Sequence, residues 1–277
     1  MNRIDALKTI AQDAQRGELT FPTGIDVSLN IMRALDAPDC HIDRADQLVQ
    51  AEPVISARVV AVANSAVYNR SEQKITDLRN AISRIGLRTT RTLATAIATR
   101  QMAGTPTDPA LRKALSQLWE HTTHVAALAQ VIARQVTHLD PETALFAGVV
   151  HEIGGFYLIS RASEFPGLLE GEAADWEDNA EAAVGRAVLA RLQVPETVME
   201  AVEAMWQGYL ALPPATLGDT LLLANELAPI SSPLNKPGRT EGEPSPIIDA
   251  AVDDQMLSNI LNDSATEVES LAKALQY

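Results

Sequence analysis

Cysteine is almost absent from this sequence of 277 residues, and aromatic side chains are scarce. The single cysteine, Cys40, excludes an internal disulfide framework and suits a reducing compartment. Only 4% of the residues are aromatic, whereas alanine and leucine are abundant, which is a composition that favours helices over sheets. We therefore expect an all-α protein.

Long apolar runs and several familiar catalytic motifs are also missing. No run approaches the roughly 20 apolar residues that span a bilayer, and the first predicted helix is amphipathic rather than an apolar signal segment. The sequence has no Gly-rich phosphate loop, no Gly-x-Ser-x-Gly elbow and no Cys-x-x-Cys pair. We expect a cytoplasmic protein that makes no membrane contact.

Acidic residues outnumber basic ones, and the excess lies in one half of the chain. Residues 1–105 contain 13 basic and 11 acidic side chains, whereas residues 106–277 contain 9 basic and 25 acidic ones. Such an acidic second half disfavours binding to nucleic acid, whose phosphates require a basic surface. The simplest interpretation of the net negative charge is that it keeps the protein soluble. The alternatives are that the two halves attract each other or that the first half binds an acidic partner.

Two long apolar helices are predicted in the middle of the chain, around the segment 118–155. Each follows an Asp-Pro pair that is typical of an N-cap and a first helical position, at Asp108 and at Asp140. The second of these helices is apolar almost all round and should be buried. Gly154 and Gly155 are predicted to end it.

Ionisable side chains lie on both of these helices. His121 and His124 are on the first, and His151 is followed directly by Glu152 on the second. Neutral imidazole and carboxylate are suitable ligands for a divalent cation, so this pattern indicates a candidate metal site.

The order of these residues resembles the HD phosphohydrolase superfamily. One branch of this superfamily, the HDOD (HD-related output domain) family of bacterial signalling proteins, is more similar to two segments of this sequence, LWEHTTHVA and FAGVVHEIGG. Residues 52–69 and 74–94 resemble the front half of an HDOD domain, and the resemblance covers about residues 20–228. It implies an HD-like multi-helix core preceded by an N-terminal helical lobe.

The resemblance also implies which residues correspond to the superfamily's metal ligands. His121 and His151 match the two histidines, whereas Glu152 replaces an aspartate and Asn225 replaces the later aspartate. The additional histidines of two-metal members fall near Glu181 and near 205–206, where this chain has none. A binuclear centre is thus excluded. We expect no metal and no other cofactor, although a single ion on His121, His151 and Glu152 remains an alternative.

Four segments are expected along the chain. These are an N-terminal helical lobe (1–105), a degenerate HD-like lobe (106–228), a linker or long loop (229–247) and a C-terminal helical tail (248–277). The pattern predicts two short helices in the tail, 248–260 and 264–276. Ser264 and Glu267 have the spacing of a capping box at the start of the second helix. The pattern leaves open whether the tail packs on the core.

Candidate contacts to a partner or ligand are His124 and five residues of the first lobe. Asn64 and Ser65 lie at a helix end, where a structural role is favoured over a functional one. Arg84, Arg88 and Arg91 share a face only if Gly86 between them does not turn the chain. Such a stripe is usually a solvated surface, and an anion site or a contact with the acidic half is the alternative.

The resemblance and the altered ligands favour a non-catalytic regulatory protein. We expect a bacterial signal-transduction module that binds a protein partner or a small ligand through the degenerate HD pocket and the groove between the lobes. The alternative is a metal-dependent phosphohydrolase acting on a nucleotide or a cyclic dinucleotide.

Overall fold

The computed structural model describes residues 2–22, 25–71, 73–208, 211, 213–234 and 255–276. Over these residues the chain forms helices and no strand, which confirms the prediction of an all-α fold. The first half contains α1 (Arg3–Gln15), α2 (Ile25–Leu35), α3 (Ile42–Gln50), α4 (Pro53–Ala63) and α5 (Leu78–Met102). The second half contains α6 (Pro109–Ile132), η1 (Ala133–Thr137), α7 (Pro141–Val150), α8 (Ile153–Arg161), α9 (Ala173–Trp176), η2 (Glu177–Glu181), α10 (Ala182–Arg191), α11 (Glu196–Gln207), α12 (Leu217–Leu227) and α14 (Gln255–Gln276).

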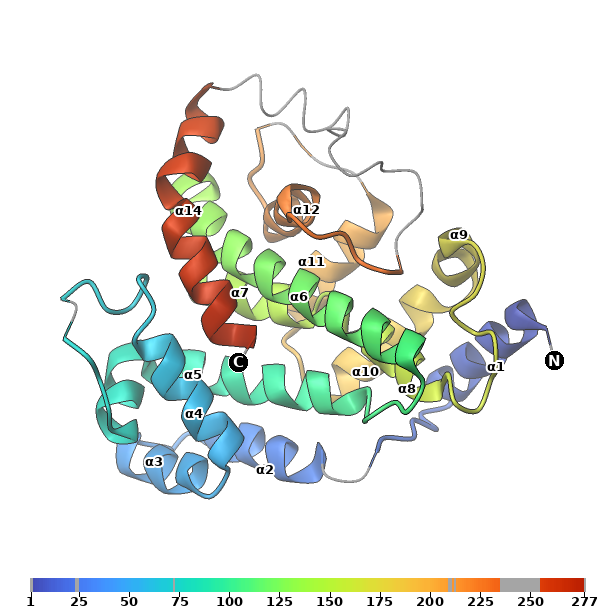
Figure 1. Cartoon of the computed structure of the whole chain (residues 1–277), viewed down its shortest axis with the longest axis horizontal. Coiled ribbons are helices and arrows are strands. Elements are labelled where there is room, and N and C mark those ends of the chain that lie inside the picture. Colours follow the sequence, from blue (N-terminus) through green and yellow to red (C-terminus); the bar gives the residue numbers. More distant parts are fainter. Residues whose placement is uncertain are drawn as a thin grey trace.

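The core is built around α6 and α7, which cross near the middle of the molecule (Figure 1). The two helices approach so closely at Gly148 that a Cβ atom there would lie 2.4 Å from the Cα atom of Ala126. Helices α12 and α14 also pack on α6, while α5 packs on α7. This arrangement surrounds α7 with protein, as its uniformly apolar sequence predicts.

Both Asp-Pro pairs begin helices as predicted. The Asp108 carboxylate accepts hydrogen bonds from the backbone of the first turn of α6, and the Asp140 carboxylate accepts one from the Thr143 N–H in α7. These side chains satisfy N–H groups that have no partner within their own helix.

Replacing either capping aspartate by alanine gives a matched pair of stability measurements. We expect Asp108→Ala to lower the free energy of unfolding by about 1 kcal/mol, the usual value of an N-cap. Asp140→Ala should lower the free energy of unfolding slightly more, because Asp140 also pairs with Arg88. Both side chains of this pair are well exposed, so the pair contributes only about 0.5 kcal/mol. Urea unfolding followed by circular dichroism measures both values. Equal losses would show that the Arg88 contact contributes nothing.

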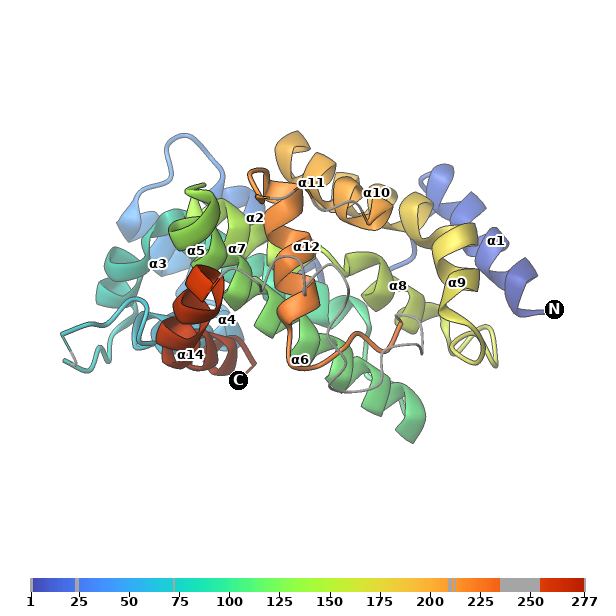
Figure 2. The ribbon, with the colours of Figure 1, turned by 90° about the horizontal axis from the view of Figure 1, so that it is seen from above.

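Helix α1 does not belong to the lobe formed by α2 to α5. It packs on α10, η2 and α9 at the opposite end of the molecule, as both views show (Figures 1 and 2). The Arg3 guanidinium donates to the carbonyl oxygens of Leu168 and Glu172, at 2.9 Å each, and pairs with Asp175. The structure thus differs from the expected boundary, which placed residues 1–105 in one lobe. The amphipathic pattern of α1 predicts a buried face but not the helices that cover it.

The C-terminal tail is one continuous helix over its described residues, 255–276, and not two. Ser264 lies within α14 and accepts a hydrogen bond from Gln135, and Glu267 pairs with Arg134, so the predicted capping box is wrong. The helix packs on α6 and α4 and buries Leu271 and Leu275. Residues 248–254 of the expected tail lie outside the described residues.

The predicted end of the second central helix is also wrong. Helix α7 ends at Val150, and Gly154 and Gly155 lie in the first turn of α8. A Cβ atom on Gly154 would lie 3.3 Å from the Cα atom of Gly185, and one on Gly155 would lie 2.4 Å from a methyl group of Leu234. These glycines allow close packing and do not terminate the helix.

The segment Pro141–Arg161, which covers α7 and α8, is long and apolar enough to span a membrane by composition. In this structure 89% of its most apolar window is buried inside the protein. The apolar character of this segment is therefore accounted for by the core.

Candidate functional site

His121, His151 and Glu152 come together in the core of the second half. His121 projects from α6, whereas His151 and Glu152 occupy the break between α7 and α8. One ligand atom from each residue lies within 4.8 Å of the other two. Both imidazoles are almost fully buried, with 1% and 2% of their surface exposed.

The backbone fixes how the two imidazoles are oriented. Nδ1 of His121 lies 2.7 Å from the carbonyl oxygen of Ile230, and Nδ1 of His151 lies 2.7 Å from that of Gly148. A carbonyl oxygen only accepts, so each Nδ1 carries a hydrogen, and in a neutral ring Nε2 then has a lone pair. The two Nε2 atoms are 3.3 Å apart. Two neutral rings cannot hydrogen-bond to each other in this arrangement, so their lone pairs face each other unless a proton or a cation lies between them.

Burial keeps these imidazoles neutral at physiological pH. It lowers the pKa of His121 to about 4, against smaller opposing effects of hydrogen bonds to Ile230 and Asn225. It lowers the pKa of His151 to about 3, with a further contribution from the neighbouring His121. Burial also raises the pKa of Glu152 to about 7, although Ser232 hydrogen-bonds to the carboxylate. A shared proton is thus disfavoured at neutral pH.

The donors that are present fit one divalent cation and not two. Two imidazole Nε2 atoms and the Glu152 carboxylate face one another, and each Nδ1–H is held by a carbonyl oxygen, as is usual for metal-bound histidine. A bound cation would polarise a water molecule or an ester oxygen. The position that would supply a further anionic ligand holds Asn225, whose neutral amide hydrogen-bonds to His121. The structure therefore brings together all four positions that the sequence predicted.

Residues 229–234 cover this cluster, and we call them the strap. Besides the Ile230 carbonyl oxygen on His121, Ser232 hydrogen-bonds to Glu152, and the Ser231 carbonyl oxygen accepts from Gln117. The sequence predicted a linker or long loop here because these residues are rich in proline and serine. The described part of it is a packed wall of the site, and residues 235–247 lie outside the described residues.

An acidic cavity of about 490 Å³ adjoins the cluster. Glu152 and Asn225 line it, and Glu177, Asp178, Glu181, Arg186, Glu203 and Trp206 contribute further side chains. Burial, and then the charges of Glu152 and Glu177, raise the pKa of Glu181 to about 8. The resemblance pointed to the position of Glu181 only as one lacking a histidine; its carboxylate was missed. This surplus of carboxylates disfavours a phosphate ligand.

His124, Asn64 and Ser65 make hydrogen bonds within their own surroundings. Nδ1 of His124 lies 2.8 Å from the carbonyl oxygen of Glu120 on the same helix. The Asn64 amide ties the end of α4 to the following loop, since it donates to Val60 and Ile75 and accepts from the Ile75 N–H. The Ser65 hydroxyl donates to the carbonyl oxygen of Val62. All three side chains have structural partners.

The three arginines do not share one face. Gly86 has φ 82° and ψ 167°, which interrupts the helical geometry of α5 between Arg84 and Arg88. The Arg84 side chain donates to the carbonyl oxygen of Tyr68. Arg88 pairs with Asp140 in the second half of the chain. It therefore makes a contact with the acidic half, which was the alternative to a solvated surface.

Arg91 also reaches across the two halves of the chain. Its Nε atom lies 2.6 Å from Asp36, and its guanidinium lies 5.1 Å from the ring centroid of Phe146 on α7. Each of the three arginines therefore makes contacts within the fold.

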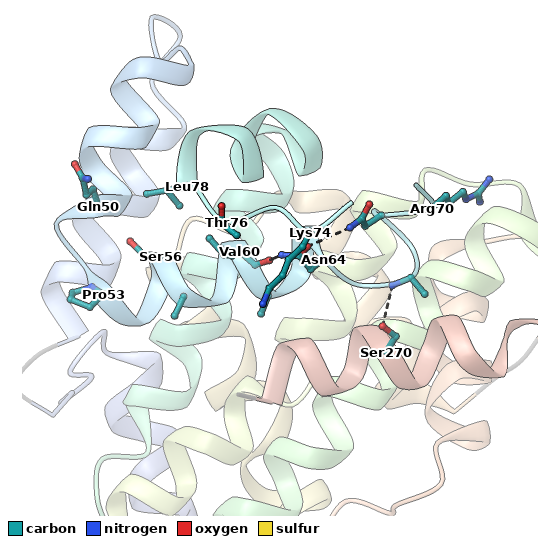
Figure 3. Close-up of a pocket in the computed structure, with 14 residues that line it drawn as sticks. Gln50, Pro53, Ser56, Val60, Asn64, Arg70, Lys74, Thr76, Leu78 and Ser270 are labelled. Carbon is teal, nitrogen blue, oxygen red and sulfur yellow. Dashed lines mark hydrogen bonds between the residues drawn. The ribbon is translucent and has the colours of Figure 1, made fainter. Parts of the chain in front are cut away.

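A larger groove lies on the first lobe, between α4, the loop 64–78 and α14. It encloses about 1300 Å³. Figure 3 shows that Ser56 and Val60 of α4, with Asn64 at the end of that helix, face Lys74 and Thr76 of the loop, while Ser270 of α14 closes one end. Asn64 is the one predicted contact residue that lines this groove.

Comparison with known proteins agrees with this architecture. A family model described as the HDOD domain matches residues 21–207. No curated protein matches the chain.

Three solved structures illustrate the similarity. A protein of Shewanella amazonensis SB2B, provisionally named a metal-dependent phosphohydrolase, has a TM-score of 0.78 and 22% identity, with 99% of this chain and 100% of that one covered. An HDOD domain protein of unknown function from Geobacter sulfurreducens has a TM-score of 0.65 and 22% identity, covering 98% and 99%. A protein of Marinobacter aquaeolei VT8, provisionally named a signal transduction protein, has a TM-score of 0.65 and 14% identity, covering 100% and 67%. At these identities the likeness shows a shared fold.

Proposed function

Because the chain belongs to the HDOD family, we propose that it is a non-catalytic regulatory module of bacterial signal transduction that acts in the cytoplasm by binding a protein partner or a small ligand. The observation that carries this proposal is the closed state of the degenerate site. The strap buries His121 and His151, and Asn225 stands where a hydrolase of this superfamily would have a carboxylate. The remaining opening is acidic, so it repels the phosphoester that such an enzyme would attack.

Two regions support the binding role. The first region is the degenerate pocket together with the interface between the two halves of the chain, where Arg88 pairs with Asp140. The groove of Figure 3 is the other, because it is concave, partly apolar and bordered by Arg70 and Lys74. Neither cation belongs to any ion pair found among the described residues. These charges suit a partner that presents acidic side chains.

A metal-dependent phosphohydrolase acting on a nucleotide or a cyclic dinucleotide is the second candidate. The facing lone pairs of His121 and His151 favour it, because one cation on these rings and Glu152 would remove their repulsion.

Elemental analysis of protein purified without chelator separates the two candidates. For the non-catalytic module we expect less than about 0.1 equivalent of Mn, Fe, Ni or Zn per chain and no hydrolysis of bis-p-nitrophenyl phosphate with any of these ions added. One equivalent of metal that is lost in His121→Ala but kept in His124→Ala, together with turnover, would establish the enzyme. Stoichiometric metal without turnover would assign the ion a structural role and leave the regulatory proposal standing.

A further inference from the structure

A buried arginine lies outside the site described above. Arg58 on α4 has only 2% of its surface exposed. Its Nη1 atom donates to the carbonyl oxygen of Ala274 on α14, at 3.2 Å, but its Nε atom is buried without any partner. Arg100 on α5 is close enough for its charge to affect Arg58, and it donates to the carbonyl oxygen of Gln276, also at 3.2 Å. Two guanidinium groups thus contact the last turn of α14.

These two cations lack a full counter-charge in the part of the chain that the structure describes. No ion pair among these residues includes Arg58 or Arg100. The C-terminal end of a helix supplies about half a negative charge, so the last turn of α14 offsets only part of the two positive ones. Burial, followed by repulsion from Arg100, lowers the pKa of Arg58 to about 10, so it stays charged at neutral pH. A buried cation without an anion is costly.

The space beside these arginines is a formed cavity. It measures about 470 Å³ and is lined by both guanidinium-bearing residues and by Pro22, Val54, Ile97, Gln101, Gly104 and Thr105. Val54, 49% exposed, and the buried Ile97 form its apolar part. Arg100 is held over the ring of Trp119 at 5.6 Å, which orients its guanidinium. The cavity therefore combines a cationic end with an apolar wall.

We propose that Arg58 and Arg100 form a binding site for a small organic anion, whose carboxylate or phosphate group pairs with the two guanidiniums and whose apolar body lies against Val54 and Ile97. Planar guanidinium groups suit both head groups, because each can donate two parallel hydrogen bonds. The site joins α4 and α5 of the first lobe to α14. Its ligand thus stabilises the docking of the C-terminal helix, independently of the His121 cluster.

Isothermal titration calorimetry with phenyl phosphate and with benzoate tests this site, and phenol serves as the neutral probe. We expect one binding site per chain for at least one of the two anions and no heat with phenol. Arg100→Gln and Arg58→Gln should each weaken binding at least tenfold, whereas Arg112→Gln, at an exposed arginine of α6, should leave it unchanged. Comparison of the two anions identifies the preferred head group. Circular dichroism checks that each variant is folded. If Arg58→Gln does not fold, the Arg100→Gln variant alone tests the site, because Arg100 is exposed.

A second form of the protein, extended by a neutral Gly-Ser pair after Tyr277, is titrated in parallel. This extension moves the terminal carboxylate of the polypeptide, which could otherwise compete for the same guanidiniums. Failure of both anions to bind either form would overturn the proposal. So would equal affinity of the parent protein and the Arg100→Gln variant.

Discussion

Gly148→Ala is expected to lower the free energy of unfolding by about 3 kcal/mol, because the added methyl group would overlap the backbone of a neighbouring helix. The added Cβ atom would lie 2.4 Å from the Cα atom and 2.9 Å from the backbone nitrogen of Ala126. Backbone atoms inside a helix cannot rotate away, so α6 and α7 must separate. That separation would disturb the placement of His121 and His151, because one projects from each side of this contact.

Gly155→Ala is the matched control for that substitution. Its Cβ atom would also meet another atom at 2.4 Å, but that atom is a terminal methyl group of Leu234, which can change rotamer. We expect a loss of about 1 kcal/mol or less from chemical denaturation at equilibrium. If the two variants were equally stable, the close crossing of α6 and α7 would not be the constraint that we describe.

Stability should have a plateau between about pH 4.5 and 6.5 and should fall on both sides of it. The pKa values of His121 and His151 lie below the value of 6.5 expected in the unfolded chain, so the unfolded chain binds more protons there and acidification destabilises the fold. Glu152 and Glu181 have pKa values raised above 4.5, so the folded chain binds the additional protons and acidification stabilises it. Between pH 4.5 and 6.5 the effects of the two histidines and the two glutamates on the free energy of unfolding have opposite signs and cancel.

Outside that interval one pair acts alone. Below pH 4.5 the glutamates no longer add to the free energy of unfolding as the pH falls. Protonation of the two histidines in the unfolded chain should then lower that free energy by about 2–3 kcal/mol per pH unit. Above pH 6.5 the loss of the glutamate protons should reduce stability until about pH 8. The experiment is urea unfolding from pH 3.5 to 8.5 in the presence of chelator, which prevents a cation from competing with these protons.

Single substitutions assign each side of the profile. His151→Asn, which removes a titrating ring, should flatten the acid side, and Glu181→Gln should flatten the alkaline side. The same measurement on the unsubstituted protein is the reference for both variants. A profile that stays the same in both test variants would mean that these buried groups do not control the pH dependence.

Local signals in the sequence predicted the parts of this fold that local chemistry determines. Both Asp-Pro pairs begin helices, because a carboxylate and a fixed φ angle act within one turn. The grouping of His121, His151, Glu152 and Asn225 followed from the family resemblance, since periodicity alone cannot pair residues on different helices. The structure confirms the all-α fold, and the family model that matches residues 21–207 confirms the HDOD recognition.

What the sequence did not predict depends on contacts between distant segments. A proline- and serine-rich stretch has the composition of a linker, yet the strap packs because its carbonyl and hydroxyl groups bond to His121 and Gln117 on α6 and to Glu152 in the break between α7 and α8. Ser264 and Glu267 have the spacing of a cap, but partners on η1 hold them within a continuous helix. The site residue that was missed, Glu181, has no motif of its own and gains its significance from the nearby Glu152 carboxylate.

The position of α1 has a consequence for how the chain acquires its structure during synthesis. Helix α1 is synthesised before the segments on which it packs, since Arg3 bonds to Leu168, 165 positions later. Helix α1 therefore cannot reach its packed position until those later residues have been synthesised, because its partners α9, η2 and α10 all follow Leu168 in the chain. For this helix, the order of translation and the order of assembly are thus different.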